Sequence, residues 1–215
     1  MDNCIISVVG HGKLECNADT LFIELSVGRT DKKSSVAQEK VNIVINKIIS
    51  ELKNIGIISK NITTSSMEFR DNYEYDDKNN RKFIGQHVGQ SVEFYIYDIK
   101  NHIDKAIKIL DFVGDSNERI HYSQIFFLKN DETIKIQCRE IAFKDAKDKA
   151  EHFAKLSNVS IIGVSSISET KKTDDYDHFD QMICGSSPPE EEKITNFSIK
   201  KIETKVKLYI DFIAK

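Results

Sequence analysis

The chain of 215 residues contains no stretch of about 18 consecutive apolar residues, the length that a membrane-spanning helix needs. It also lacks the pattern of a signal peptide, because Met1 to Cys4 lead directly into a strand-like apolar segment without a basic or a long apolar region. These absences predict no membrane span and a cytoplasmic location.

The chain has little excess of either charge, with a formal net charge of −3 at pH 7. Lysines and acidic residues alternate along the sequence, which is typical of a solvated protein surface. A protein that binds nucleic acid or an anionic membrane usually shows a basic excess on one face. We therefore expect no nucleic-acid partner.

The sequence is also poor in motifs for metal binding and catalysis. None of its four cysteines forms a CxxC pair, and its six histidines form neither HxH nor HExxH. No GxSxG motif occurs, and Gly10-His11-Gly12 has neither the third glycine nor the helix of a phosphate-binding loop. We expect no enzymatic activity, no catalytic residue, no cofactor and no metal.

Three weaker alternatives stay open at this point. A disulfide between Cys4 and Cys16 would form if their strands were paired. His87 and His121 lie in strands that could be neighbours, where they could converge on a metal. The acidic residues near His178 could hold a divalent ion weakly, although ordering a flexible loop opposes this.

Apolar residues recur every three or four positions in two long segments, the period of a helix face. Residues 131–156 form the longer one, with a stripe of small side chains at Ala142, Ala146, Ala150 and Ala154. Residues 34–55 form the second, with a capping box at its start and Gly56 as a left-handed cap at its end. A short helix is predicted for residues 101–112.

The remaining apolar segments follow the period of strands. Strands are predicted at residues 4–12, 20–29, 62–75, 83–97, 120–128, 159–168 and 197–214. We expect the first two to form a hairpin. The third and fourth form a long hairpin with a polar tip at residues 76–80, where the acidic residues lack the glycine and glutamate spacing of a calcium loop.

The predicted order ββαββαβαββ indicates the α+β class, with a sheet of long antiparallel or mixed strands and helices on one face. We expect a single domain over residues 1–215. Within it, residues from about 170 to 195 are acidic and contain both prolines of the chain, which predicts a mobile loop.

Two features indicate an interaction surface. The strand at 120–128 is apolar on both sides, so it is either central in the sheet or in contact with another subunit. The hairpin at 69–97 is rich in aromatic residues, which suit protein interfaces but also pack across strands within a sheet. The candidate interface residues are Tyr73, Tyr75, Tyr95, Tyr97, Ile125 and Phe127.

Several motifs, taken together and in order, resemble those of the SIMPL-domain family, formerly called domain of unknown function 541. They lie in segments 6–12, 52–57, 62–65, 73–77, 83–86, 142–154 and 163–169, and they include a V-x-G-x-G start and an A-x-x-x-A-x-x-K-A helix. Ala18 departs from the family pattern, which has a proline before Asp19.

The resemblance implies a bacterial protein without established catalytic residues or cofactor. Members of this family are often exported to the periplasm or the cell envelope, some are linked to oxidative-stress defence, and a related member assembles into a large ring- or channel-like oligomer. We therefore expect a non-enzymatic, self-assembling homo-oligomer linked to stress defence or the cell envelope. The alternative is a module that binds a protein or peptide partner through the aromatic hairpin at 69–97.

Overall fold

The computed structural model describes residues 4–75, 80–170 and 198–215, which form two compact units. We call them the three-stranded unit and the five-stranded unit after their sheets. The first contains residues up to Asn17, the segment from Asn130 and the segment from Lys201, and the second contains Ala18–Lys129 and Phe197–Lys200. Neither unit is one continuous segment of the chain. This division does not test the single domain expected over residues 1–215, which stays a prediction.

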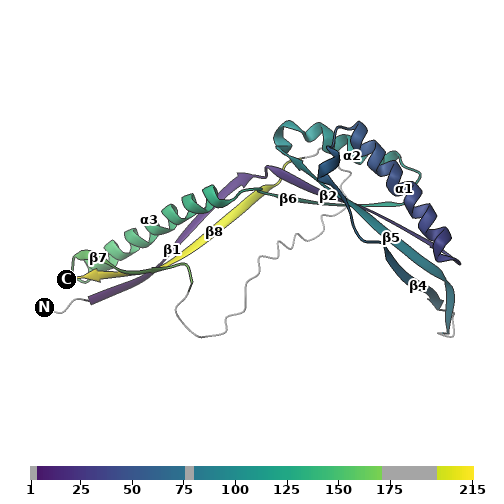
Figure 1. Ribbon diagram of the computed structural model, residues 1–215. Coiled ribbons are helices and arrows are strands. Elements are labelled where there is room, and N and C mark those ends of the chain that lie inside the picture. Colours follow the sequence, from purple (N-terminus) through teal and green to yellow (C-terminus); the bar gives the residue numbers. More distant parts are fainter. Residues whose placement is uncertain (1–3, 76–79, 171–197) are drawn as a thin grey trace. The chain divides into compact units, whose positions relative to one another are not determined.

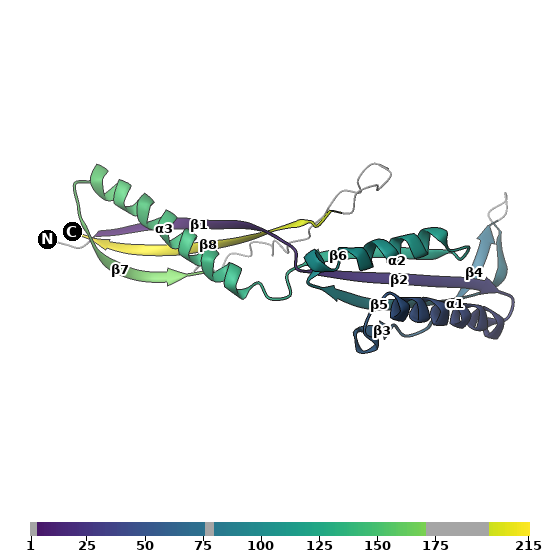
Figure 2. The same ribbon diagram turned by 90° about the horizontal axis from the view of Figure 1, so that it is seen from above.

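The three-stranded unit consists of β1 (Cys4–Asn17), α3 (Glu132–Leu156), β7 (Ile161–Ser168) and β8 (Lys201–Ala214). Its sheet is antiparallel in the order β1-β8-β7, and α3 runs along β1 and β8 (Figures 1 and 2). The predicted strand at 4–12 thus extends to Asn17 and pairs with the last strand.

The small-residue stripe of α3 lies against β1. Cys138, Ala142, Ala146, Ala150 and Ala154 are buried. A Cβ atom at Gly10 would lie 1.9 Å from the Ala142 carbonyl oxygen, and one at Gly12 would lie 1.9 Å from the Cys138 carbonyl oxygen. The helix backbone therefore approaches the strand so closely that only glycine fits at these positions.

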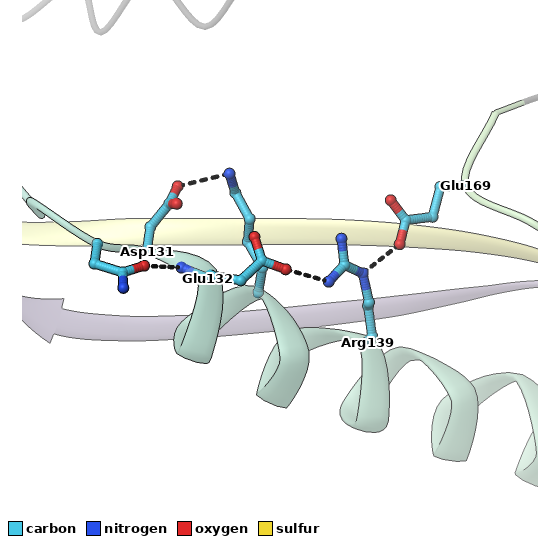
Figure 3. Close-up of polar contacts among 6 residues, drawn as sticks. Asp131, Glu132, Arg139 and Glu169 are labelled. Atoms are coloured by element: carbon cyan, nitrogen blue, oxygen red, sulfur yellow. Dashed lines mark hydrogen bonds and ion pairs between the residues drawn. The ribbon is translucent and has the colours of Figure 1, made fainter.

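A chain of polar contacts at the start of α3 joins the helix to the end of β7 (Figure 3). The Asn130 side chain accepts a hydrogen bond from the Glu132 N–H at 3.1 Å, which satisfies one of the free donors of the first turn. The Arg139 guanidinium donates to Glu132 at 3.1 Å and to Glu169. Glu169, the residue after β7, is thereby held against α3.

A second polar cluster joins α3 to β1. The Asp145 carboxylate accepts hydrogen bonds from the Lys149 ammonium at 2.6 Å and from the His11 backbone N–H at 2.8 Å. The same ammonium donates to the Val9 carbonyl at 2.9 Å. The Lys149 ammonium, and after it the His11 N–H, hold the pKa of Asp145 below its usual range.

We expect the Asp145→Asn variant to be less stable than the wild type at pH 7 by about 1 kcal/mol, a small effect because the pair is partly exposed. This stabilisation is present above the pKa of Asp145 in the unfolded chain, near 3.8, and is lost as the pH falls through the lower pKa of the folded state. Urea unfolding between pH 7 and pH 2 should show the difference between the two proteins shrinking below about pH 4. Asp148→Asn, at an exposed position on the same helix, is the control, and an equal effect there would contradict the assignment.

The described residues of the five-stranded unit form five strands, two long helices and two short 3-10 turns. Its strands are β2 (Thr20–Asp31), β3 (Ile62–Thr64), β4 (Glu68–Tyr75), β5 (Arg81–Tyr97) and β6 (Ile120–Phe127). Its helices are α1 (Ser34–Asn54) and α2 (Ile103–Asp115), with 3-10 turns at Ser59–Asn61 and Ile99–Asn101. The sheet order is β3-β5-β2-β6, and β4 pairs with a further part of β5.

Both helices pack on the same face of this sheet, where they build the larger core (Figure 1). Alternate residues of β2, from Leu21 to Val27, point into it together with Val88 to Ile96 of β5. The other sheet face carries no helix in the described residues of this unit. The α+β class and its antiparallel strands are therefore confirmed, with the short strand β3 added to the predicted order.

Several local predictions were wrong because they assumed that neighbours in sequence pair. Strands β1 and β2 do not form a hairpin, since β1 pairs with β8 and β2 pairs with β5 and β6. Cys4 and Cys16 both lie on β1, roughly 40 Å apart along an extended strand, so no disulfide can join them.

Of the two predictions for the ends of α1, one is confirmed and one was wrong. Gly56 has a φ of +91°, which confirms the left-handed cap after α1. The capping box at the start is absent, since Lys33 is the N-cap and no side chain caps the helix. The acidic loop at about 170–195 lies outside the described residues except for Thr170, and so does the hairpin tip except for Asn80.

Candidate functional site

Aromatic and apolar side chains gather at one end of the helix-free face of the five-stranded sheet. We call this group the aromatic face, and it consists of Phe22, Tyr95, Tyr97, Ile125 and Phe127. The strand register explains it, because Phe22 on β2 lies opposite Tyr95 on β5 and opposite Ile125 on β6. Three neighbouring strands thus present their large side chains on the same side.

Tyr95 is the centre of the aromatic face. Its ring centroid lies 5.1 Å from that of Phe22, 6.0 Å from that of Tyr97 and 6.0 Å from that of Phe127. Tyr97 is stacked on it and Phe127 meets it edge-on, both favourable arrangements for aromatic rings. The rings pack on one another but stay accessible, with 38% of Tyr95 and 38% of Tyr97 exposed.

Contacts around Asp19, just before β2, connect the strand ends at the edge of the aromatic face. The Asp19 carboxylate accepts hydrogen bonds from the Thr20 hydroxyl at 2.6 Å and from the Lys129 backbone N–H at 2.8 Å. The Lys129 ammonium lies 4.3 Å from the Tyr97 ring centroid, a cation–π contact. The end of β6 is therefore fixed beside β2 and β5.

Strand β6 forms one edge of the sheet in the described part of this unit. It contains no Lys, Arg, Asp, Glu or Pro, the residues that natural edge strands use to prevent pairing. It also pairs with β2 without a register shift, whereas β7, an edge of the other sheet, has two. Ile125, on this edge, is 58% exposed. Of the two alternatives for this segment, a central strand is therefore excluded in the described part of the sheet, and contact with another subunit stays a prediction.

The structure brings together Tyr95, Tyr97, Ile125 and Phe127 from the predicted interface residues. Tyr73 and Tyr75 lie apart from them on β4, which pairs with the far part of β5. The Tyr73 ring packs locally, 5.5 Å from the Phe83 ring and 3.5 Å from the Arg81 guanidinium carbon. Phe22 was not predicted, although a phenylalanine on the polar side of an alternating strand is a signal for a surface contact.

The alternative of a metal held by His87 and His121 finds no support in the described residues. Among them, no group of three or more His, Cys, Asp or Glu side chains is placed to hold a metal ion. The two histidines do line one polar pocket on the helix-free face. His178 lies outside the described residues, so the proposed ion site around it is not tested.

Comparison with known proteins identified related sequences. The model of the SIMPL family, described as "Protein of unknown function (DUF541)", matches residues 6–211. The chain is 27% identical over 177 residues to the "26 kDa periplasmic immunogenic protein" of Brucella abortus, covering 78% of this chain and 67% of that protein. The protein of the same name from Brucella melitensis gives the same identity and coverage.

These relatives are named as periplasmic proteins, which gives no support to the cytoplasmic location expected from the sequence. None of the described helices is both long enough and apolar enough to cross a membrane. A solved structure, an amidase of the hydantoinase/carbamoylase family from Burkholderia phymatum, is similar at 8% identity with a TM-score of 0.25. That match covers 56% of this chain and 28% of the amidase, and at this TM-score it supports no inference.

Proposed function

Because the chain belongs to the SIMPL family, whose function is unknown, we propose that it is a non-enzymatic protein that assembles with further copies of itself through β6 and the aromatic face. The observation that carries this proposal is a strand edge that pairs with no further described strand and has no protecting charges, beside an accessible cluster of large apolar side chains. The periplasmic name of the Brucella relatives supports a role of the assembly in the cell envelope.

The first step of the argument concerns the backbone. An edge strand has a row of N–H and C=O groups that lack partners in the sheet, and these groups can pair with another strand. Two copies of β6 can pair antiparallel about a twofold axis, which places the same surface of each copy in the interface. The sheets of the two copies would then form one continuous sheet.

The second step concerns the side chains. Ile125 and Phe127 lie on β6, so the pairing of two β6 strands brings both aromatic faces side by side. Exposed apolar surface is then removed from water, which favours association by about 25 cal/mol for each Å² of apolar surface buried. The contact is not opposed by like charges of lysine, arginine, aspartate or glutamate, because β6 contains none of these residues.

The non-enzymatic part of the proposal rests on the sequence, which contains no recognised spacing of catalytic residues. A purified protein that turns over a substrate, with loss of activity on a single substitution, would contradict it.

We expect Ile125→Lys to dissociate the assembly. A lysine at this position would bring two ammonium groups into a symmetric interface, and a cost of about 1.4 kcal/mol for each copy would weaken association about 100-fold. Light scattering over a range of protein concentrations measures the mass of both proteins. The control is Ile43→Lys on α1, because Ile43 is 62% exposed and Ile125 is 58% exposed.

A wild-type protein that stays monomeric at every concentration would contradict self-assembly, as would an oligomer that both variants preserve. A monomer would favour the alternative of a protein- or peptide-binding module on the hairpin 69–97. The observation behind this alternative is that Phe69, Tyr75 and Phe83 are exposed. Unchanged capture of partner proteins by a Tyr73→Ala, Tyr75→Ala double variant would eliminate that surface.

A further inference from the structure

A polar pocket of about 660 Å³ lies on the helix-free face of the five-stranded sheet. Strands β2, β4, β5 and β6 contribute to its wall, together with Ser65, Ser66 and Arg119 outside the strands, and the aromatic face contributes no residue. Its charged and titratable side chains are Glu24, Glu68, Arg70, His87, Arg119 and His121. A pocket in which several polar groups converge is a candidate binding site.

The pocket is hollow because the sheet carries small residues at this place. Gly28 on β2 and Gly89 on β5 lie opposite each other, and Ser26 lies opposite Ser91. The His87 ring lies directly over Gly28, since a Cβ atom there would be 2.6 Å from Cε1 and 2.7 Å from Nε2 of the ring. The glycine thus creates the space that the imidazole occupies on the pocket floor.

The imidazole of His87 belongs to a short chain of hydrogen bonds. The Asn72 side-chain amide donates to the Thr30 hydroxyl oxygen at 3.4 Å, and this oxygen lies 3.2 Å from His87 Nδ1. Since Thr30 accepts from Asn72, its own proton is available for Nδ1. When the Thr30 hydroxyl donates to Nδ1, the ring proton is on Nε2, the nitrogen that lies over the glycines lining the pocket. In this tautomer the pocket has an N–H donor on its floor.

The two arginines of the pocket have cationic groups that can bind a ligand. The Arg119 guanidinium makes no ion pair with the residues that the structure describes, and Arg70 makes a single contact of 4.0 Å with Glu68. The main chain at Arg119 is held in place, because its carbonyl accepts a hydrogen bond from Arg29, which also pairs with Glu118. A guanidinium on a fixed main chain suits an oxyanion, to which it can donate two parallel hydrogen bonds.

The two carboxylates of the pocket restrict the ligand further. Glu24 already accepts one hydrogen bond, from the Ser26 hydroxyl at 3.2 Å, and each carboxylate has room for more. Glutamates beside arginines would repel a ligand that is anionic throughout, but they accept hydrogen bonds from hydroxyl groups. The volume also exceeds what a bare oxyanion fills.

We propose that this pocket binds a small polyhydroxylated molecule with one oxyanion group, that is, an acidic sugar. Arg119 and the His87 Nε2–H hold the oxyanion, and Glu24 and Glu68 accept hydrogen bonds from the hydroxyl groups. The oxyanion is a phosphate or a carboxylate, which guanidinium groups bind in the same way.

Calorimetric titration of the full chain with glucose 6-phosphate, glucuronate and glucose tests the proposal and distinguishes the two oxyanions. We expect at least one of the acidic sugars to bind about tenfold more tightly than glucose. Arg119→Gln should weaken that binding by about tenfold or more, the loss of a charge-assisted contact. Arg81→Gln, which removes an exposed arginine of the same unit outside the pocket, should leave it unchanged.

Binding of neither acidic sugar would overturn the proposal, and so would equal binding of glucose or an unchanged affinity of Arg119→Gln. A second measurement does not depend on a variant. Long-range ¹H–¹⁵N spectra report which ring nitrogen of His87 carries the proton, and a proton on Nδ1 in the neutral ring would contradict the assigned donor.

Discussion

Replacing Gly12 by alanine is expected to destabilise the three-stranded unit by about 3 kcal/mol, the upper part of the usual range for overpacking a core. The reason is geometric, since the new Cβ atom would be 1.9 Å from the Cys138 carbonyl oxygen and 2.8 Å from its carbonyl carbon. These are backbone atoms of α3, so no side-chain rotation relieves the clash, and the helix must move away from β1. Thermal unfolding should show a midpoint lower by roughly 6–12 °C.

The matched control lies in the same sheet. A Cβ atom at Gly163 on β7 would have nothing within 4 Å, so Gly163→Ala should leave the midpoint unchanged or raise it slightly. Equal losses for the two variants would mean that the alanine acts through strand conformation in general, and the close approach of α3 to β1 would then not be the cause.

Replacing Phe94 by alanine should have the largest effect in the five-stranded unit. The side chain is fully buried, and its strand neighbours are Ile23 on β2 and Ile62 on β3. Removing a buried phenylalanine costs about 3–5 kcal/mol, because apolar contacts are lost and a cavity remains. Chemical denaturation monitored by circular dichroism measures the loss.

Glu93→Ala is the control for this variant. Glu93 precedes Phe94 on β5, points to the helix-free face and lies opposite Glu24, a like charge. Its removal should therefore be neutral or slightly stabilising. A loss close to that of Phe94→Ala would contradict the assignment of Phe94 to the core.

The two variants together test the expected single domain over residues 1–215. If the chain unfolds as one cooperative domain, Gly12→Ala and Phe94→Ala should shift the same single transition. If the two units unfold separately, each variant should shift only the transition of its own unit. In the second case the prediction of a single domain would be wrong.

The helices and most strands could be predicted from the sequence because their periodicity is local. The residues of α3 and α1 repeat their apolar positions from turn to turn, and the four alanines recognised as a stripe on α3 are all buried. The pairing of strands could not be predicted in this way. The partner of β1 is β8, at the other end of the sequence, and nothing in residues 4–17 distinguishes that partner from β2.

The part of the candidate site that depends on local periodicity was predicted from the sequence, and the part that depends on strand pairing was not. Tyr95 and Tyr97 are two residues apart on one strand, and so are Ile125 and Phe127, so each pair shares a sheet face whatever the pairing. Tyr73 was grouped with them because it lies in the same hairpin, but the pairing of β5 with β2 ends at Gln86, and beyond it only β4 accompanies β5. Phe22 could be added only once β2 was known to lie between β5 and β6.

The pairing of β1 with β8 has a consequence for protein synthesis. At the usual rate of translation, β8 leaves the ribosome roughly ten to forty seconds after β1. During this interval β1 has no partner strand, while nearly all of the five-stranded unit is synthesised. The nascent chain would thus be at greatest risk of aggregation through its first strand, and a chaperone that binds extended apolar segments would bind there. Crosslinking of stalled nascent chains that detects no chaperone at residues 4–17 would contradict this order of events.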